Sequence, residues 1–225
     1  MKLVILIPVK DPARAKHRLA PLLTSVERER IAWAMFQDVA RALHGIAAQI
    51  ATVTNSARVA GWAAGMGWRV MHEAKQVSES SSVDAASRQL AGEGIDAALR
   101  LPGDLPLIQS GDVQELIGCA LPPGSALMVP SWDLGGTNAL LRTPPDLFPS
   151  RFGPDSLVLH MGEALNARAR VKIIQNPRIA LDLDEPGDIA RFMEQESETE
   201  TRHLLTEIHI RERLARGVDP GTPEP

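Results

Sequence analysis

Apolar and polar positions along the chain follow two periods that together indicate an α/β protein. The chain begins with a continuous apolar and β-branched run, KLVILIPV (residues 2–9), which is typical of a strand buried on both faces. A helix is predicted over residues 24–43, because Thr24 and Glu27 form a capping box and apolar residues then recur every three or four positions.

The same succession of a strand-like and a helix-like run occurs three more times. The pairs are QIATVTN and ARVAGWAAG (49–55 and 57–65), WRVMH and SVDAASRQLAGEG (68–72 and 82–94), and DAALRLPG and SGDVQELIGCAL (96–103 and 110–121), and the strand-like SALMVPS (125–131) follows. This alternation predicts a mainly parallel sheet with helices on both faces.

After residue 131 the pattern changes. A segment rich in glycine and proline predicts turns and one strand, NALLR (138–142). The elements predicted after it are a helix over 156–169, strands over 170–175 and 178–184, and a short helix over 185–196. We therefore expect one domain over residues 1–196.

The tail, residues 197–225, differs in composition from the rest of the chain. Residues 197–217 predict one amphipathic helix that docks or forms an oligomer contact, and the last eight residues predict disorder.

Composition excludes several classes of protein. The 225 residues carry a net charge of −4, which argues against a nucleic-acid or anionic-membrane binder, although a local basic patch can still hold a small anion. The lone Cys119 excludes an internal disulfide framework, and no apolar run reaches the roughly 20 residues of a membrane span. We expect a cytoplasmic protein.

The loop after the first predicted strand concentrates positive charge without any glycine. It carries Lys10, Arg14, Lys16 and Arg18, and open parallel sheets place their ligands at this end of the strands. Arginine and lysine can neutralise phosphate oxygens directly. A phosphate site and a solvated charged loop are both compatible with this pattern.

Two groups of aspartates follow other predicted strands. Asp104 comes directly after the strand that ends in RLPG, where it can bind Mg²⁺ or cap a turn. Asp182 and Asp184 are two apart on an apparent strand, which predicts that they share a face and repel one another unless a cation lies nearby. The alternative is that Asp184 only starts the next helix.

Two further motifs, GGTN (135–138) and FGPDS (152–156), could present backbone amides to an anion, with Pro154 in the first turn of a helix. Ordinary turn chemistry is the alternative. No Ser-His-Asp arrangement is legible in the sequence.

Taken in order, PVK…ARAKHRL, PGDLPL, GGTNALL, RFGPDS and ALDLDEPGDI resemble the 2-phospho-L-lactate guanylyltransferase family over roughly residues 1–193. The resemblance implies a single-domain α/β fold of the nucleotide-diphospho-sugar transferase (GT-A-like) type. It also implies transfer of GMP from GTP to 2-phospho-L-lactate, phosphoenolpyruvate or 3-phosphoglycerate in the biosynthesis of the deazaflavin coenzyme F-420.

The resemblance also implies roles for individual residues, with Mg²⁺ as the cofactor. Catalysis would fall to Lys16, Arg18 and Asp104; GTP binding to Lys10, Arg14, Lys16 and Arg18; binding of the acid to Thr137, Gly153 and Ser156; and metal binding to Asp104, Asp182, Asp184 and Asp155.

One position departs from the family pattern, in which many members have a Gly-Leu-Asn step before the third helix. Here Asp84 stands where the asparagine is expected. A carboxylate there could accept hydrogen bonds from the N1–H and amino groups of guanine, or it could simply favour a helix N-terminus.

The expected partners are small molecules, namely GTP and the phosphorylated acid, together with a phospholactyl-type transferase that consumes the product. The apolar face of the tail is compatible with a homodimer. Rival interpretations are a molybdopterin or sugar-phosphate nucleotidyltransferase of the same fold and a non-catalytic nucleotide-binding module.

Overall fold

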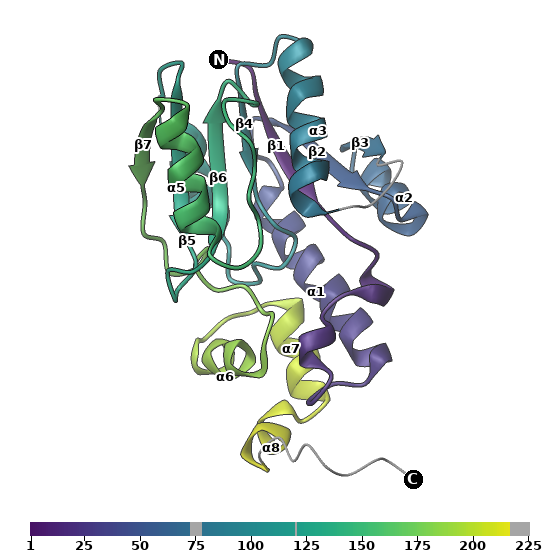
Figure 1. The fold of residues 1–225 in the computed structure, drawn as a ribbon. Coiled ribbons are helices and arrows are strands. Elements are labelled where there is room, and N and C mark those ends of the chain that lie inside the picture. The colour runs from purple at the N-terminus through teal and green to yellow at the C-terminus, as the bar shows by residue number, and fades with distance from the viewer. Residues whose placement is uncertain (73–77, 120, 217–225) are drawn as a thin grey trace.

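A seven-stranded sheet runs through the centre of the protein (Figure 1). The computed structural model describes residues 1–72, 78–119 and 121–216. The strands are β1 (Leu3–Pro8), β2 (Gln49–Thr54), β3 (Arg69–His72), β4 (Ala97–Arg100), β5 (Ser125–Pro130), β6 (Thr137–Thr143) and β7 (Arg170–Ile173), in the spatial order β3-β2-β1-β4-β6-β5-β7. Only β6 runs antiparallel to its neighbours, so the prediction of a mainly parallel sheet is confirmed.

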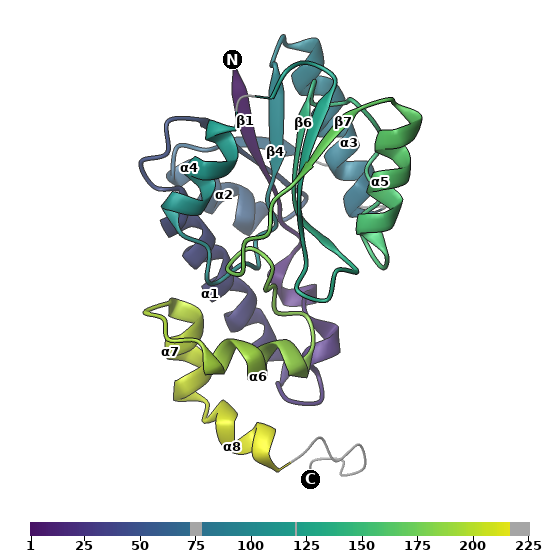
Figure 2. The same ribbon diagram turned by 90° about the vertical axis from the view of Figure 1, so that its left-hand side faces the viewer.

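Helices cover both faces of this sheet (Figure 2). They are α1 (Ser25–Leu43), α2 (Ala57–Gly65), α3 (Glu79–Gly92), α4 (Ser110–Gly118), α5 (Ser156–Asn166), α6 (Pro186–Glu194), α7 (Glu200–Glu207) and α8 (Ile210–Ala215), with 3-10 turns η1 (Pro12–Arg14) and η2 (His17–Leu19) between β1 and α1. No helix among the described residues combines the length and the apolar character needed to cross a membrane.

Alternate side chains of β1 point to opposite faces of the sheet and contact different helices. Ile5 and Ile7 are buried against α1, α2 and α4, whereas Val4 and Leu6 are buried against α3. Helix α5 covers the same face as α3, over β5 and β6. Because both faces are covered, the central strands consist of continuous apolar runs, as the sequence predicted.

The chain reverses its direction of travel across the sheet between β1 and β4. From β1 it steps outward to β2 and β3, and it then returns to place β4 on the other side of β1. Strands β1 and β4 are parallel, so their carboxyl ends open at the same edge. Such a switch point is where open α/β sheets bind ligands.

A second core lies beyond this edge of the sheet and has no strand in it. It combines side chains of the loop after β1, the first half of α1, the segment before α6, and helices α6, α7 and α8. Leu19, Leu22 and Leu23 anchor the loop after β1 in this core, and Leu181 and Leu183 enter it from the segment before α6. The lower parts of Figures 1 and 2 show these elements together.

This second core explains where the predicted elements are wrong. Residues 178–184 form no strand: Ile179 is buried in the main core, and Leu181 and Leu183 pack onto helices of the second core rather than extending the sheet. The tail forms two helices instead of one, since His209 has a left-handed backbone (φ 54°) that separates α7 from α8. The predicted disorder of residues 218–225 falls outside the described residues.

Helix α7 is tethered to α1 by a buried carboxylate. Asp38 accepts hydrogen bonds from the backbone amides of Glu200 (2.8 Å) and Thr201 (3.0 Å) and from the Thr201 hydroxyl (2.7 Å). The carboxylate satisfies amides that the first turn of a helix leaves without partners. The tail from residue 197 to residue 216 is therefore an integral part of the domain.

Leu205 offers a direct test of this tail packing. Its side chain is fully buried in the second core, so Leu205→Ala should lower the free energy of unfolding by about 2–5 kcal/mol in urea titration. Met66→Ala, at an exposed position, should change it by less than about 0.5 kcal/mol. Equal effects of the two substitutions would contradict the packing.

Candidate functional site

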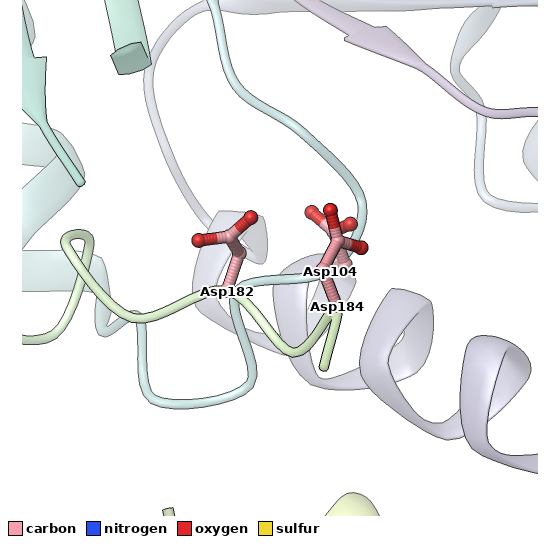
Figure 3. Close-up of side chains that lie close together, drawn as sticks. All are labelled: Asp104, Asp182 and Asp184. Carbon is pink, nitrogen blue, oxygen red and sulfur yellow. The ribbon is translucent and has the colours of Figure 1, made fainter. Parts of the chain in front are cut away.

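Three carboxylates meet at the edge of the sheet where β1 and β4 end. One oxygen from each of Asp104, Asp182 and Asp184 lies within 4.8 Å of the others. Figure 3 shows the three side chains pointing to the same side from two neighbouring loops. The two aspartate groups that were predicted separately from the sequence therefore form one cluster.

Close packing places Asp104. The residue follows β4 in the loop Leu101–Asp104, and a Cβ atom on Gly103 would lie 3.3 Å from Val9 Cγ2 and 3.5 Å from Phe36. The loop therefore lies so close to the segment after β1 that a side chain at position 103 would crowd its neighbours, and glycine suits this position.

Leucine and aspartate alternate over residues 181–184, and this alternation directs Asp182 and Asp184 to one side although the segment is not a strand. Leu181 and Leu183 enter the second core, and the two aspartates between and after them point the other way. The side chain of Asn138 fixes the segment by donating to the Asp182 carboxylate (3.0 Å) and to the backbone carbonyls of 179 and 180.

The Lys16 ammonium group lies inside the cluster. Its Nζ donates to Asp104 Oδ2 at 2.5 Å and to Asp184 Oδ1 at 2.6 Å, and only 7% of its side chain is exposed. Lys16 itself has a left-handed backbone (φ 57°), which turns its side chain inward between η1 and η2. The structure thus joins the basic loop to the aspartates.

These contacts shift the ionisation of the cluster. Burial would lower the pKa of Lys16, but the Asp104 and Asp184 carboxylates raise it above its ordinary value. Lys16 in turn lowers the pKa of Asp184. Burial and then the charges of Asp104 and Asp184 raise the pKa of Asp182 to about 7.

The cluster has the donor chemistry of a divalent-cation site. Three carboxylates face one ammonium group, and Asp104 Oδ1 is buried without a hydrogen-bond partner among the described residues. A buried carboxylate oxygen without a donor is unfavourable, and a hard cation such as Mg²⁺ binds oxygen ligands of this kind. The residues therefore fit the predicted metal.

The other three cations of the loop lie at its surface. Lys10, Arg14 and Arg18 are exposed, and Arg18 pairs with Glu185 at 3.3 Å. Their side chains are accessible to an anion that approaches the aspartate cluster.

The predicted acid-binding residues lie on the α5 side of the sheet. Thr137 and Ser156 are buried, and the Ser156 hydroxyl accepts a hydrogen bond from the Thr137 amide (2.9 Å). His160 Nδ1 lies 3.0 Å from the Thr137 hydroxyl, and its Nε2 accepts from the Arg151 amide (2.8 Å). Gly153 is exposed and has a φ of 126°, a conformation that suits glycine.

The backbone amides at the start of α5 are not free to bind an anion, contrary to the prediction from the FGPDS motif. Pro154 precedes the helix rather than lying in its first turn, and Asp155 is the N-cap. The Ser156 amide donates to the Gly153 carbonyl, and the Leu157 amide donates to the Gly135 carbonyl. Asp155 is exposed and does not join the aspartate cluster, so the structure does not bring this predicted metal ligand to the others.

The two glycines of the GGTN motif likewise lie in a turn, and Thr137 and Asn138 begin β6. The Gly135 amide donates to Asp133 Oδ1 (3.0 Å) and the Gly136 amide to Ser131 Oγ (2.6 Å). Both amides are used within the chain, which favours the turn interpretation of this motif.

Asp84 lies on α3 and is not part of the aspartate cluster. Its carboxylate accepts from the Ser150 amide (3.0 and 3.1 Å) and lies 3.5 Å from Arg142 Nη1. It therefore holds the segment before Gly153, and its contact with guanine stays a prediction.

Sequence reasoning assigned no role to three residues that support the site: Asn138, Arg100 and His160. The buried Arg100 contacts the Thr137 and Asn138 carbonyls, ion-pairs with Glu79 and stacks on Phe152. Two signals in the sequence point to such residues: Asn138 belongs to the GGTN motif, and Arg100 is a charged residue at the end of an otherwise apolar strand.

A sizeable groove lies away from the aspartate cluster. It encloses about 550 Å³ between α1, α2 and α7, and none of the predicted site residues lines it. The convergence of charged groups, rather than the size of a cavity, identifies the candidate site.

Comparison with known proteins agrees with this geometry. The profile of the family described as "Guanylyl transferase CofC like" matches residues 3–220. The chain belongs to this family. The match includes the tail up to residue 220, so the sequence-based expectation that the resemblance ends near residue 193 was wrong.

Three relatives of this guanylyltransferase illustrate the range of acids used. It is 34% identical to a phosphoenolpyruvate guanylyltransferase of Rubrobacter xylanophilus (85% of this chain, 94% of the relative) and 32% identical to a 3-phospho-D-glycerate guanylyltransferase of Colwellia psychrerythraea (84% and 90%). It is 28% identical to a 2-phospho-L-lactate guanylyltransferase of Methanothermobacter thermautotrophicus (97% and 96%).

A solved structure supports the predicted fold. A Desulfovibrio desulfuricans protein described only as a candidate nucleotide-diphospho-sugar transferase superposes with a TM-score of 0.78 at 19% identity, covering 95% of this chain and 99% of that one. The nucleotide-diphospho-sugar transferase-like fold is confirmed, and the chain is a nucleotidyltransferase of the guanylyltransferase type.

The buried His160 generates a pH prediction. Burial, together with the charges of Arg100, Arg142 and Arg151, lowers its pKa from 6.5 to about 3. The unfolded chain takes up this proton near pH 6.5 and the folded protein does not, so the contribution to stability is present above pH 6.5 and is lost as the pH falls toward 3.

We therefore expect the stability advantage of the wild type over His160→Gln to shrink by about 1–3 kcal/mol between pH 7.5 and 4.5. Urea unfolding of both proteins at several pH values measures this difference. An advantage that does not change with pH would contradict a neutral His160.

Proposed function

We propose that this protein transfers GMP from GTP to the phosphate of a phosphorylated three-carbon acid, with release of pyrophosphate, and that Mg²⁺ is its cofactor. We place this reaction in deazaflavin coenzyme F-420 biosynthesis, where a phospholactyl-type transferase consumes the product. The observation that carries the proposal is the insertion of Lys16 into the aspartate cluster at the switch point of the sheet.

The nucleophile of this reaction needs no general base. The second pKa of a phosphate monoester is about 6, so the attacking phosphate oxygen is already ionised near neutral pH. His160, the histidine nearest the predicted acid site, is buried, and its low pKa keeps it neutral. Positioning and charge stabilisation are therefore the expected sources of rate.

Asp104, Asp182 and Asp184 would hold the metal. When bound, Mg²⁺ supplies Lewis-acid stabilisation of phosphate charge at this edge of the sheet. The carboxylates need a fixed spacing for this role, and the packing of Gly103 and the hydrogen bonds of Asn138 provide it.

The basic loop would bind the triphosphate. Lys10, Arg14 and Arg18 are exposed beside the cluster, and Lys16 can exchange a carboxylate partner for a phosphate oxygen. Positive charge on this loop stabilises the pyrophosphate leaving group as it develops charge.

The phosphorylated acid would lie near Gly153. Gly153 is exposed and leaves room for a ligand. The buried Thr137 and Ser156 support the neighbouring backbone: the Ser156 hydroxyl accepts from the Thr137 amide, and the Thr137 hydroxyl lies next to His160. This arrangement supports a binding role for all three predicted residues, with Thr137 and Ser156 acting largely by positioning.

The direct test is an assay of pyrophosphate release with GTP, Mg²⁺ and each acid in turn: 2-phospho-L-lactate, phosphoenolpyruvate and 3-phosphoglycerate. We expect release with at least one acid, and a loss of about 100-fold or more, or about 2.7 kcal/mol, in Asp104→Asn. Release that needs no acid, or none with any acid, would contradict the proposal.

Asp155→Asn is the matched control for the metal assignment. Because Asp155 lies outside the cluster, this variant should retain far more activity than Asp104→Asn. A loss of activity as large as that of Asp104→Asn would indicate that Asp155 is a metal ligand and would contradict this assignment.

Lys16 provides a second test that does not depend on turnover. Its ammonium group competes with a cation for Asp104 and Asp184, so Lys16→Met should bind Mn²⁺ more tightly in the absence of GTP, by roughly tenfold or about 1.4 kcal/mol. The same variant should lose GMP transfer. Electron paramagnetic resonance of free Mn²⁺ measures the affinity.

Lys10→Met is the control, because it removes an equal charge from an exposed position of the same loop. Its effect on Mn²⁺ affinity should be clearly smaller. If the two variants bind Mn²⁺ equally well, Lys16 does not compete for the metal position.

A further inference from the structure

A buried arginine at the end of β4 has an N–H group without an acceptor. Arg100 is two residues after Ala98, so its side chain points to the face of the sheet that α3 covers, and only 8% of that side chain is exposed. Its Nε is buried and has no hydrogen-bond partner among the described residues. An unpaired buried donor on a charged group is unfavourable, so Arg100 is suited to a further acceptor.

The guanidinium group of Arg100 is incompletely used on the side that carries Nε. Nη1 lies 3.3 Å from the Thr137 carbonyl oxygen and 3.4 Å from that of Asn138, while Nη2 donates to one carboxylate oxygen of Glu79. Guanidinium groups bind carboxylates most strongly through two parallel N–H···O bonds. Glu79 engages Nη2 and not Nε, so the edge formed by these two nitrogens lacks the second bond that a carboxylate can supply.

This guanidinium group adjoins the proposed binding site for the phosphorylated acid. It contacts the Thr137 carbonyl, and its Cζ lies 4.1 Å from the ring centroid of Phe152, the residue before Gly153. The Phe152 amide in turn donates to Ser80 Oγ (2.8 Å) at the start of α3. Arg100 therefore packs, from the side of the sheet, against the loop to which we assign the acid.

The present partner of Arg100 can be exchanged for another carboxylate. Glu79 lies in the first turn of α3, where the helix dipole stabilises a carboxylate even without Arg100, and 27% of its side chain is exposed. Removing Glu79 without a replacement would leave a buried charge unpaired, which is strongly unfavourable. An incoming carboxylate avoids this penalty, because it supplies the same charge and can also accept from Nε.

We propose that Arg100 binds the carboxylate of the phosphorylated acid, which takes the place of Glu79 on the edge formed by Nε and Nη2. Arg100 is then a specificity-determining residue, because a compound that has the phosphate but no carboxylate leaves Arg100 paired with Glu79. The three acids considered above all carry one carboxylate, so this contact selects the class of acid and not the individual member. The inference rests on the proposed function, since it concerns the acceptor of that reaction.

Two substitutions with opposite expected effects test the proposal in the pyrophosphate-release assay, with the acid that the wild type uses best. Glu79→Gln removes the competing charge and should lower the KM for the acid by about three- to tenfold. Arg100→Lys keeps the charge but loses the paired N–H groups, so it should raise this KM by roughly tenfold or more. The KM for GTP should change by less than about twofold in both variants. Circular dichroism melting checks that each variant is folded.

Glu163→Gln is the matched control, because it breaks the ion pair with the exposed Arg151 (2.7 Å) beside the same loop. It should leave the KM for the acid within about twofold of the wild type. If the pair of Arg100 and Glu79 were purely structural, both Glu79→Gln and Arg100→Lys would impair the enzyme. The direction of the Glu79→Gln effect therefore distinguishes the two roles.

A binding measurement tests the selectivity without turnover. 3-Phosphoglycerate and glycerol 3-phosphate differ only in a carboxylate that replaces a hydroxymethyl group. In titration calorimetry with Mg²⁺ and guanosine 5′-(α,β-methylene)triphosphate, which cannot release pyrophosphate, the wild type should bind 3-phosphoglycerate at least about tenfold more tightly. Arg100→Met should bind the two compounds with affinities within about threefold of each other.

Each of four outcomes would overturn the proposal: a higher KM for the acid in Glu79→Gln, an unchanged KM in Arg100→Lys, a wild type that does not prefer 3-phosphoglycerate, or a preference that persists in Arg100→Met. If the wild type releases pyrophosphate and the variants behave like Glu163→Gln, only the role of Arg100 is wrong. If the wild type releases none with any acid, the proposed function is wrong, and the calorimetry still decides whether Arg100 recognises a carboxylate.

Discussion

The ammonium group of Lys16 and the carboxylates of Asp104 and Asp184 bring together three segments that are far apart in the sequence. Each partner comes from a loop at the same edge of the sheet, and the contact lies where charge is poorly screened. Removing one member would leave an uncompensated charge in a buried setting, which is strongly unfavourable. The position of the basic loop, the packing of Gly103 and the course of residues 181–184 are all consistent with maintaining this contact.

The edge of the sheet that carries the aspartate cluster has side-chain cations where other nucleotide-binding folds have a glycine-rich loop. Glycine loops bind phosphates through backbone amides, whereas here the cations are side chains on or beside two short 3-10 turns. Side-chain cations need an anchor, and Leu19, Leu22 and Leu23 provide it in the second core. The chemistry of the loop thus depends on packing contributed by the end of the chain.

Much of the fold followed from the sequence because its strands are buried on both faces and its helices carry clear caps. The run over residues 2–9 and the Thr24 capping box were both confirmed. Residues 178–184 were misassigned, because alternation of leucine and aspartate occurs wherever a segment lies between a core and a polar site, with or without a neighbouring strand.

The candidate site was predictable only in part. Asp104, Asp182 and Asp184 were identified from their places after apolar runs, and the structure brings them together. Their contact with Lys16 was not predictable, because it depends on a left-handed turn at a residue type that seldom adopts one. The sequence also did not show that the amides of Ser156 and Leu157 bond to carbonyls of their own chain. Helix capping and anion binding have the same sequence signals, so the two could not be told apart.

The second core has a consequence for the order in which the protein is made. Arg213 binds Glu27 across 186 positions of sequence, and Leu205 and Ile210 pack near Leu19 in the same cluster. A growing chain that has completed the sheet still lacks the helices that support its basic loop. During synthesis the loop gains this support only after α7 and α8 have left the ribosome, so a chain that stops before them lacks the packing that holds the loop beside the aspartate cluster.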